Sequence, residues 1–432
     1  MFYSQERTWR EPVAESFGML LRKLRTEAGI SLGELARRII YSKGHVSKIE
    51  NGLQRPSAMF AKLCDRALST DGVLTAAVQP ASSQAVEPPD ADGGVWVMEL
   101  DETGGVRFNQ VSRRTMLAGA GVLLGSALTR GAGIATDEHT LTVLRSAFYQ
   151  HRELGMMASP RVVLAPAIAQ VHALRTLAAG NPEPMRSELL RLASRVAEFA
   201  GWMSQEAGQE GAALWWTDRA VELAAAGRDP HLASFALVRR AELAMYRHDP
   251  VSTVGLTQQA QRDPAAGSRI LGLAAQFEAQ GHALAGDLSA YRRALDRAAS
   301  LLAVREDGTA PVLGMSSAPD QVSLAAGWSL YDLGRPAEAA QILDKQVPGI
   351  RPTARRAKAR FGVRRALAHA LNGDIEHACS AVRDLLPDIA QVDSATIRGD
   401  LRDLARTLNR WHGDRAVREF QADLMPVLNV PS

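Results

Sequence analysis

The chain has 432 residues, of which 46% are hydrophobic, 22% are charged and only 5% are aromatic. This balance indicates a globular chain long enough for two or more domains, and the abundance of Ala and Leu favours a mostly helical fold. Only two cysteines are present, which excludes a secreted disulfide scaffold. No apolar stretch approaches the ~20 residues of a membrane span, so we expect a cytoplasmic protein without a membrane partner.

The net charge of +3 is unevenly distributed along the chain. Residues 1–70 carry a net charge of +5, whereas residues 71–110 carry a net charge of −6. A basic segment followed by an acidic one suggests that the first segment binds a polyanion. We therefore expect a first domain at 1–70, an acidic linker at 71–110, a connector at 111–136 and a helical domain at 137–432.

Short helices are expected in the basic segment, between residues 17 and 68. Ser31 and Glu34 have the spacing of a capping box, in which each side chain satisfies a backbone donor at a helix start. A third helix is expected from the N-cap Ser42 to Asn51, where Gly52 ends it. Two helices separated by only about four residues predict a helix-turn-helix arrangement, within a domain of four or five helices.

The third helix has two different faces on a helical wheel. The polar arc consists of Lys43, Gly44, Ser47, Lys48 and Asn51. The opposite arc consists of His45, Val46, Ile49 and Glu50. Lysine and serine suit guanine edges and phosphates, and a glycine allows a close backbone approach, so we expect the polar arc to face DNA. The alternative is a protein–protein module with a solvated basic face.

This segment resembles the lambda-repressor-like (Xre-type) helix-turn-helix family. The resemblance lies in Leu24-Arg25, Gly29-Ile30-Ser31, Glu34-Leu35-Ala36, Val46-Ser47-Lys48-Ile49-Glu50-Asn51-Gly52 and Arg55-Pro56. It implies that Lys43, Gly44, Ser47 and Lys48 face the bases, that Asn51, Arg55, Ser31 and Leu32 lie at the DNA backbone, and that Arg25 pairs with Glu50 inside the fold. Leu32 stands where the family often has Gln, so a phosphate contact there would pass to the Ser31 hydroxyl or to a backbone amide.

The acidic linker has two parts. Residues 69–94 are rich in Pro, Ala, Ser and acidic residues and are expected to form a flexible tether. The alternating residues at 95–100 and 106–108 predict a short β-hairpin. The Arg113-Arg114 pair that follows, with its apolar run, is similar to a twin-arginine export signal. Since more than 110 residues precede it, we expect a docking helix instead.

A small residue recurs seven places before a predicted turn throughout the helical domain. These residues are Gly201, Ala241, Ala279, Gly327 and Ala366, at spacings of 40, 38, 48 and 39 residues. Each spacing fits one helix pair plus a loop, which predicts an α-solenoid of about five or six pairs. The longest spacing includes a loop at 304–320, which is expected to be either a lid or idle surface. We expect the small residue where two helices cross closely, packed against Ala213, Ala339 or Ala378.

The repeated pattern resembles the tetratricopeptide repeat. Together with the N-terminal domain, it resembles a broad class of actinomycete transcriptional regulators and the peptide-sensing regulators of Gram-positive bacteria. In such arrays the first helix of each pair lines a concave surface. On this register the inward residues are Trp202, Gln205, Glu242, Tyr246, Gln276, Gln280, Trp328, Tyr331 and Leu367. Aromatic groups among Gln and Glu suit a peptide or a small amphipathic effector; the alternative is that they fill the superhelix interior or a dimer interface.

Enzyme chemistry is not indicated by the sequence. It has no His-Glu-x-x-His or Cys-x-x-Cys pair, no Gly-x-Ser-x-Gly elbow and no Walker loop. We therefore expect no enzyme activity, no cofactor and no metal. The sequence predicts a nucleoid-associated transcriptional regulator that binds double-stranded DNA as a homodimer on two half-sites. The alternative is an interaction scaffold whose repeats capture a protein partner.

Overall fold

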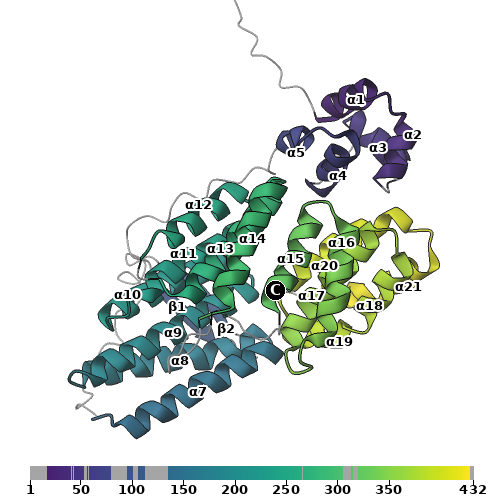
Figure 1. Ribbon diagram of the computed structural model, residues 1–432. Coiled ribbons are helices and arrows are strands. Elements are labelled where there is room, and N and C mark those ends of the chain that lie inside the picture. Colours follow the sequence, from purple (N-terminus) through teal and green to yellow (C-terminus); the bar gives the residue numbers. More distant parts are fainter. Residues whose placement is uncertain are drawn as a thin grey trace, which may run out of the picture. The chain divides into compact units, whose positions relative to one another are not determined.

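The computed structural model describes residues 17–39, 41, 43–52, 56, 58–78, 95–100, 106–111, 135–264, 266–304, 313–314 and 320–428. The chain forms two compact units, Met1–Ala85 and Val86–Ser432, and the described part is mostly helical (Figure 1). The predictions for Ser42, Arg55, residues 79–94 of the tether and the connector with Arg113-Arg114 concern residues outside this described part. The prediction of a flexible tether over 69–94 was wrong at its start, because Val73–Ala77 form a helix whose first amides are bonded by Asp65.

In its described residues, the first unit has five short helices around one apolar core. They are α1 (Phe17–Glu27), α2 (Leu32–Arg38), α3 (Lys43–Glu50), α4 (Ala58–Leu68) and α5 (Val73–Ala77). The core side chains, all at most 1% exposed, include Leu21, Leu35, Val46, Ile49, Phe60 and Cys64. The apolar stripes of the individual helices therefore meet in the centre of the unit, as their spacing predicted.

Two polar or small residues hold the helices of the first unit together. A Cβ atom at Gly18 would lie 2.5 Å from the Ile49 carbonyl oxygen, so only glycine lets α1 approach the end of α3 this closely. The carboxylate of Asp65 on α4 accepts hydrogen bonds from the backbone amides of Leu74 (2.9 Å) and Thr75 (2.8 Å). These amides have no partner within the short helix α5, so Asp65 acts as its cap.

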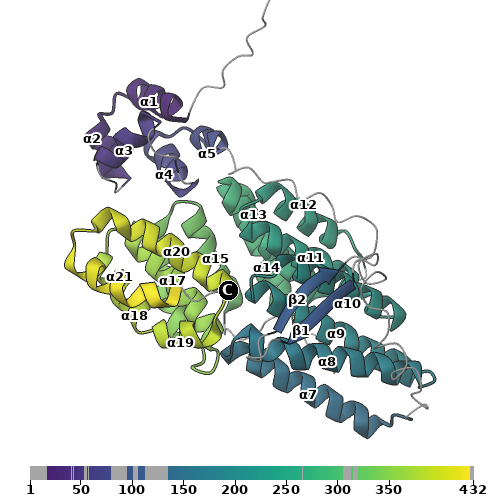
Figure 2. The ribbon, with the colours of Figure 1, turned by 180° about the vertical axis from the view of Figure 1, so that it is seen from behind.

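Two strands precede the helical array in the second unit. Strand β1 (Val95–Leu100) pairs with β2 (Val106–Val111) in an antiparallel register that places Val95 opposite Val111 and Leu100 opposite Val106. The second strand contacts α8 (Pro160–Ala179) (Figure 2).

The rest of the second unit is a stack of helical hairpins. Its further α-helices are α7 (Glu138–Met157), α9 (Met185–Glu206), α10 (Glu210–Ala226), α11 (His231–Tyr246), α12 (Pro250–Gln261), α13 (Ser268–Ala285), α14 (Leu288–Leu302), α15 (Gln321–Asp332), α16 (Pro336–Gln346), α17 (Arg355–Leu371), α18 (Ile375–Arg383), α19 (Leu386–Val392), α20 (Ala395–Leu408) and α21 (Arg415–Leu428). Two 3-10 turns, Val347–Gly349 and Asn409–Trp411, follow α16 and α20. Each helix from α7 to α17 packs against the next one, and α11, α13, α15 and α17 also pack against one another in sequence. The first helices of successive pairs therefore form one continuous layer.

The turn of each hairpin has the same geometry. The residue seven places after each small residue has a positive φ, namely Gly208 (79°), His248 (57°), Gly286 (83°), Gly334 (70°) and Gly373 (88°). The next amide then donates to a carbonyl five residues earlier, as Asp249 does to Ala244 and Asp374 to His369. This is the Schellman pattern that ends a helix. In every case the next helix begins two residues after the positive-φ residue.

The small residues lie where paired helices cross, as the pattern predicted. Ala241, Ala279 and Ala366 are each 0% exposed. A Cβ atom at Gly327 would lie 2.7 Å from Cγ of Leu343 on the return helix, a distance that requires a shift of that side chain. A larger residue would push the two helices apart, so these positions set the close spacing of the pairs.

Among the described helices, α8 alone is long and apolar enough to span a membrane by length and composition, which the sequence analysis did not anticipate. In the structure it packs between α7 and α9. Val163, Leu164, Val171 and Leu174 on α8 are buried in the main apolar cluster. A core helix meets the same criterion, so the composition of α8 is weak evidence for a membrane span.

Candidate functional site

Helix α3 presents one polar face to solvent in the first unit. Lys43, Gly44 and Lys48 are exposed, whereas Val46 is 0% and Ile49 1% exposed. The helical wheel divided the helix in the same way. The ammonium groups of Lys43 and Lys48 and the exposed backbone of Gly44 thus lie together on α3, the second helix of the helix-turn-helix arrangement.

A buried ion pair fixes α3 against α1. Arg25 Nε donates to Glu50 Oε1 at 2.6 Å and Arg25 Nη2 donates to Oε2 at 3.0 Å, while Arg25 Nη1 donates to the Ile30 carbonyl at 2.9 Å. This is the pair that the resemblance implied. The Glu50 side chain is 0% exposed, and its hydrogen bond raises the pKa of Arg25. The pair leaves the opposite, lysine-bearing side of α3 in solvent.

The remaining predicted DNA contacts have different surroundings. Asn51 is exposed, but its side-chain amide is already hydrogen-bonded. Its Nδ2 donates to the Ser47 carbonyl at 2.9 Å, and its Oδ1 accepts from Arg22 Nη2 at 2.9 Å. Ser31 caps α2 by accepting from the Glu34 amide at 3.1 Å. The Leu32 side chain packs against the core of the unit, so a contact there would have to come from its backbone. Arg55 lies outside the described residues.

Comparison with known protein families supports this reading of the first unit. Residues 16–78 match the helix-turn-helix domain. The match covers α1 to α5 and supports a DNA-binding regulator. Neither the curated proteins nor the solved structures that were compared gave a match.

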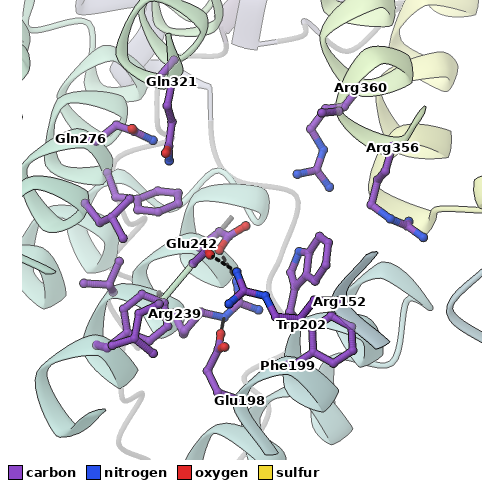
Figure 3. Close-up of a pocket in the computed structure, with 18 of the residues that line it drawn as sticks. Arg152, Glu198, Phe199, Trp202, Arg239, Glu242, Gln276, Gln321, Arg356 and Arg360 are labelled. Atoms are coloured by element: carbon purple, nitrogen blue, oxygen red, sulfur yellow. Dashed lines mark hydrogen bonds and ion pairs between the residues drawn. The ribbon is translucent and has the colours of Figure 1, made fainter. Parts of the chain in front are cut away.

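A second candidate site is a pocket in the second unit, about 1260 Å³ in volume including its part open to solvent (Figure 3). It is lined by α7, α9, α11, α13, α15, α17 and Leu313-Gly314. Apart from α7, all these helices are the first members of their pairs. The pocket is therefore built by the continuous inner layer of the stack, from side chains repeated at helical spacing.

Most of the predicted inward residues reach this pocket. Those that line it are Trp202, Glu242, Tyr246, Gln276, Gln280 and Trp328. Gln205 is not among the lining residues, because its side-chain oxygen accepts from Arg239 Nη2 at 2.7 Å. Tyr331 is not among them either; it packs against the apolar cluster that includes Ala283, Ala339 and Ala368. Leu367 does not line the pocket either; it is buried in the apolar cluster that includes Ala366 and Ala370. The repeat register thus located the inner face, with these three positions as corrections.

The arginines of the pocket were not predicted from the sequence. Arg152, Arg195, Arg239, Arg356 and Arg360 all line it, and the apolar wall includes Phe148, Phe199, Phe235, Phe277 and Phe361. Several lie one or two turns upstream of a predicted residue on the same helix. Arg195 precedes Trp202 by seven residues and Arg239 precedes Glu242 by three. Continuing the inward register toward the N-termini of α9 and α11 would have found these two arginines.

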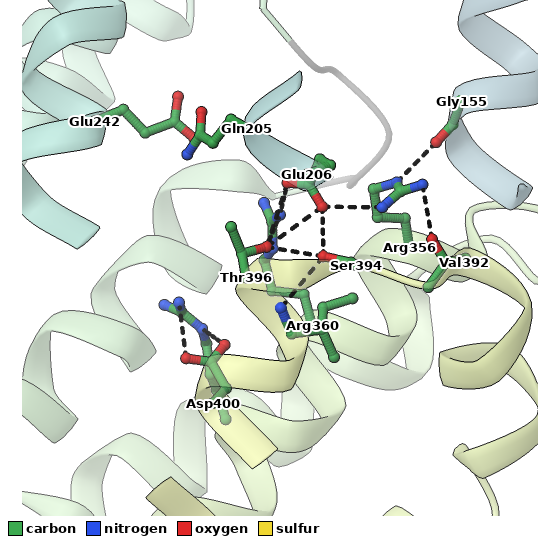
Figure 4. Close-up of polar contacts among 12 residues, drawn as sticks. Gly155, Gln205, Glu206, Glu242, Arg356, Arg360, Val392, Ser394, Thr396 and Asp400 are labelled. Carbon is green, nitrogen blue, oxygen red and sulfur yellow. Dashed lines mark hydrogen bonds and ion pairs between the residues drawn. The ribbon is translucent and has the colours of Figure 1, made fainter. Parts of the chain in front are cut away.

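One buried carboxylate connects the pocket to the C-terminal helices (Figure 4). Glu206, 0% exposed at the end of α9, accepts from Arg356 Nη1 at 2.9 Å and from the Ser394 hydroxyl at 2.6 Å, and it also pairs with Arg360. Burial by itself would raise the pKa of Glu206, but the charges of Arg360 and Arg356 and the Ser394 hydroxyl lower it to about 2. Arg356 also donates to the Gly155 carbonyl at 2.8 Å. This network joins α7, α9, α17 and α20.

A group of metal-ligand type also forms in three dimensions. Ligand atoms of Asp344, His369 and His377 lie within 4.8 Å of one another, although no sequence spacing indicated it. Arg365 donates to Asp344 and approaches His377 Nε2 at 2.9 Å. A guanidinium thus already supplies positive charge at these atoms, which makes the group an ion-pair network that joins α16, α17 and α18.

Proposed function

We propose that this protein is a sequence-specific transcriptional regulator that inserts α3 of its helix-turn-helix domain into the DNA major groove. The observation that carries the proposal is the exposed Lys43-Gly44 and Lys48 face of α3, in a segment that matches a helix-turn-helix domain. Lysine ammonium groups can donate to guanine edges and to phosphates. The buried Arg25–Glu50 pair holds the opposite side of the helix, so docking would require no unfolding of the domain.

The resemblance to Xre-type regulators supports a homodimer on DNA. A single small domain offers few base contacts, and two copies would read two half-sites about 34–36 Å apart or a multiple of that distance. In this proposal the helical repeats, which are similar to tetratricopeptide repeats, carry the dimer contacts. The protein would act in the cytoplasm, without enzymatic activity of its own.

We also propose that the pocket of the second unit binds a peptide or small-molecule effector. Support comes from its position on the inner layer and from its aromatic wall with convergent polar groups, which is the usual composition of ligand sites. Binding there would change the freedom or spacing of the two DNA-binding domains only if the ligand prefers one arrangement of the repeats over another.

The proposal is tested by DNA binding of the full chain. Duplexes selected from a random pool would define the operator, and a mobility-shift titration in increasing salt would then measure its affinity. Replacing both Lys43 and Lys48 by Ala should weaken operator binding at least about tenfold and flatten the salt dependence, because two phosphate or base contacts are lost. The same charge removal at Arg415, which is exposed in the second unit, should leave the affinity unchanged.

Two outcomes would contradict the proposal. Unchanged operator affinity after both lysine replacements would remove α3 as the reading helix. Absence of any selected sequence, with retained capture of a protein partner by the repeats, would favour the scaffold interpretation.

A further inference from the structure

The effector pocket contains more guanidinium groups than its lining carboxylates can neutralise. Five arginines and two glutamates line it (Figure 3). The glutamates are Glu198 and Glu242, and both approach the same arginine, Arg239: Glu242 in a close ion pair and Glu198 at 3.6 Å. Burial raises the pKa of Glu198, which disfavours its charged form. The balance of charge at the pocket wall is therefore positive.

Carboxylates outside the lining do not remove this excess. Asp229 binds Arg195 at 2.6 Å, and Glu206 is shared between Arg356 and Arg360. One carboxylate thus serves two guanidinium groups. Burial lowers the pKa of Arg195 and of Arg356. This direction is expected where the loss of water around a positive charge outweighs the attraction of the neighbouring carboxylates. An arginine does not relieve this cost by losing its proton in a protein.

Several buried polar atoms on the pocket residues have no hydrogen-bond partner. The donors are Arg195 Nη1, Arg239 Nε and Arg360 Nε. The others are Tyr246 Oη, Gln276 Oε1 and Gln280 Oε1. Gln276 is only 5% and Gln280 only 2% exposed. Buried polar atoms are almost always hydrogen-bonded in native proteins, because leaving them unpaired costs their desolvation energy. Their concentration at one pocket indicates a polar ligand with acceptor atoms for the guanidinium donors and at least one donor for the glutamine oxygens.

The rest of the wall is apolar and largely aromatic. It includes Phe148, Met156, Phe199, Trp202, Phe235, Leu273, Phe277, Trp328 and Phe361. Such a surface suits rings or alkyl chains, and an inorganic ion would leave it uncovered. The positive charge of the arginines and the apolar wall together indicate that the ligand is an amphipathic molecule.

We propose that this pocket binds an organic anion, an inference that rests on the proposed effector function. The carboxylate or similar oxyanion of the ligand lies at Arg239 and Arg360, and its apolar body lies against the aromatic wall. Guanidinium groups bind such oxyanions through short, charge-assisted hydrogen bonds. The ligand is either a small organic acid or the C-terminal carboxylate of a peptide, since both present the same chemistry to the arginines.

Two fluorescent probes with the same aromatic body test the proposal on the full chain. 8-Anilinonaphthalene-1-sulfonate carries an anionic group, and N-phenyl-1-naphthylamine lacks it. We expect the anion to bind saturably, one per chain, and at least about tenfold more tightly than the neutral probe. Equal affinities, or no saturable binding of the anion, would overturn the proposal without any variant being needed.

Adjacent arginines on α11 provide a matched pair of variants. Arg239 lines the pocket, whereas Arg240 pairs with Asp218 outside it. Arg239→Gln should weaken binding of the anionic probe about tenfold and leave the neutral probe unaffected, while Arg240→Gln should change neither. Circular dichroism establishes that each variant is folded. If Arg239→Gln unfolds the chain, Arg360→Gln takes its place, since Arg360 also lines the pocket and is the second arginine assigned to the anion. A folded pocket variant with unchanged anion affinity would refute the arginine assignment.

Displacement of the bound anionic probe separates the two sources of the ligand. 4-Phenylbutyrate and its amide represent small acids, and N-acetyl-Leu-Trp and its C-terminal amide represent peptides. If an acid displaces the probe and its amide does not, the proposal is supported, and the acid that displaces it identifies the source of the ligand. If the amides displace the probe as well as the acids do, or if neither acid displaces it, the proposal is contradicted. A mobility shift on the same preparation is independent of these results, so a chain that binds DNA but no anion would lose only the ligand class.

Discussion

Replacing Glu206 by Gln should destabilise the second unit in a pH-dependent manner. The pKa of Glu206 is about 2 in the folded chain and 4.5 in the absence of its partners. At about 1.4 kcal/mol per pKa unit, this difference corresponds to about 3 kcal/mol of stability at pH 7. Since the folded pKa is the lower one, the contribution is fully present above pH 4.5 and is lost as the pH falls toward 2. Gln has no charge to lose, so the variant should lack this pH dependence.

The assay is urea unfolding of both chains at several pH values between 7 and 2.5, followed by tryptophan fluorescence. Six of the seven tryptophans lie in residues 86–432, so the signal reports mainly on the second unit. The control is Glu222→Gln, because this exposed carboxylate pairs with Arg219 on the surface and should contribute less than about 1 kcal/mol. A free-energy difference between wild type and Glu206→Gln that stays constant down to pH 2.5 would refute the electrostatic reasoning.

Three further predictions concern packing, capping and ion pairing. Gly327→Ala should destabilise the second unit by about 1–3 kcal/mol, because the added Cβ clashes at the helix crossing. The control Gly399→Ala should not destabilise it, because nothing lies within 4 Å of the added Cβ. Thermal unfolding followed by circular dichroism compares the two variants. Ser31→Ala removes the cap of α2 and should cost about 1 kcal/mol, and amide hydrogen exchange in α2 would show no change if the cap were idle. Arg25→Ala leaves the buried Glu50 short of its main partner and should destabilise the helix-turn-helix domain by about 3 kcal/mol; retained operator binding at 37 °C with unchanged exchange rates would contradict this.

The sequence was most informative where local rules govern the chain. Ser31 and Glu34 predicted the start of α2, and the structure shows the Ser31 cap in place. The other half of the predicted capping box was wrong, because the Glu34 carboxylate pairs with Arg37 and Arg38. The five turns of the repeats were found from the residue seven places after each small residue, which is Gly in four turns and His248 in the fifth, since a helix ends where the backbone adopts a positive φ. The division of α3 into a buried and an exposed face also followed from periodicity alone.

The pocket was predicted only in part, because its chemistry depends on helices that are far apart in the sequence. Trp202 and Gln280 were found, since each lies beside a small residue of the repeat. Arg356 and Arg360 were not found, because only the folded stack brings α17 beside Glu206 at the end of α9. A surplus of buried positive charge is a property of that assembly and of no single segment.

By itself, the amino-acid sequence determined the helical character of the chain, its basic N-terminal domain and the period of its helix pairs, because each depends on neighbours within one or two turns of helix. Only the tertiary structure decided which side chains share a pocket and which polar atoms remain unpaired there. Gln205 and Tyr331 show the difference, since both belong to the inward register and one is held by Arg239 while the other packs into an apolar cluster. Periodicity gives the direction in which a side chain leaves its helix, but the neighbouring helices decide what it meets.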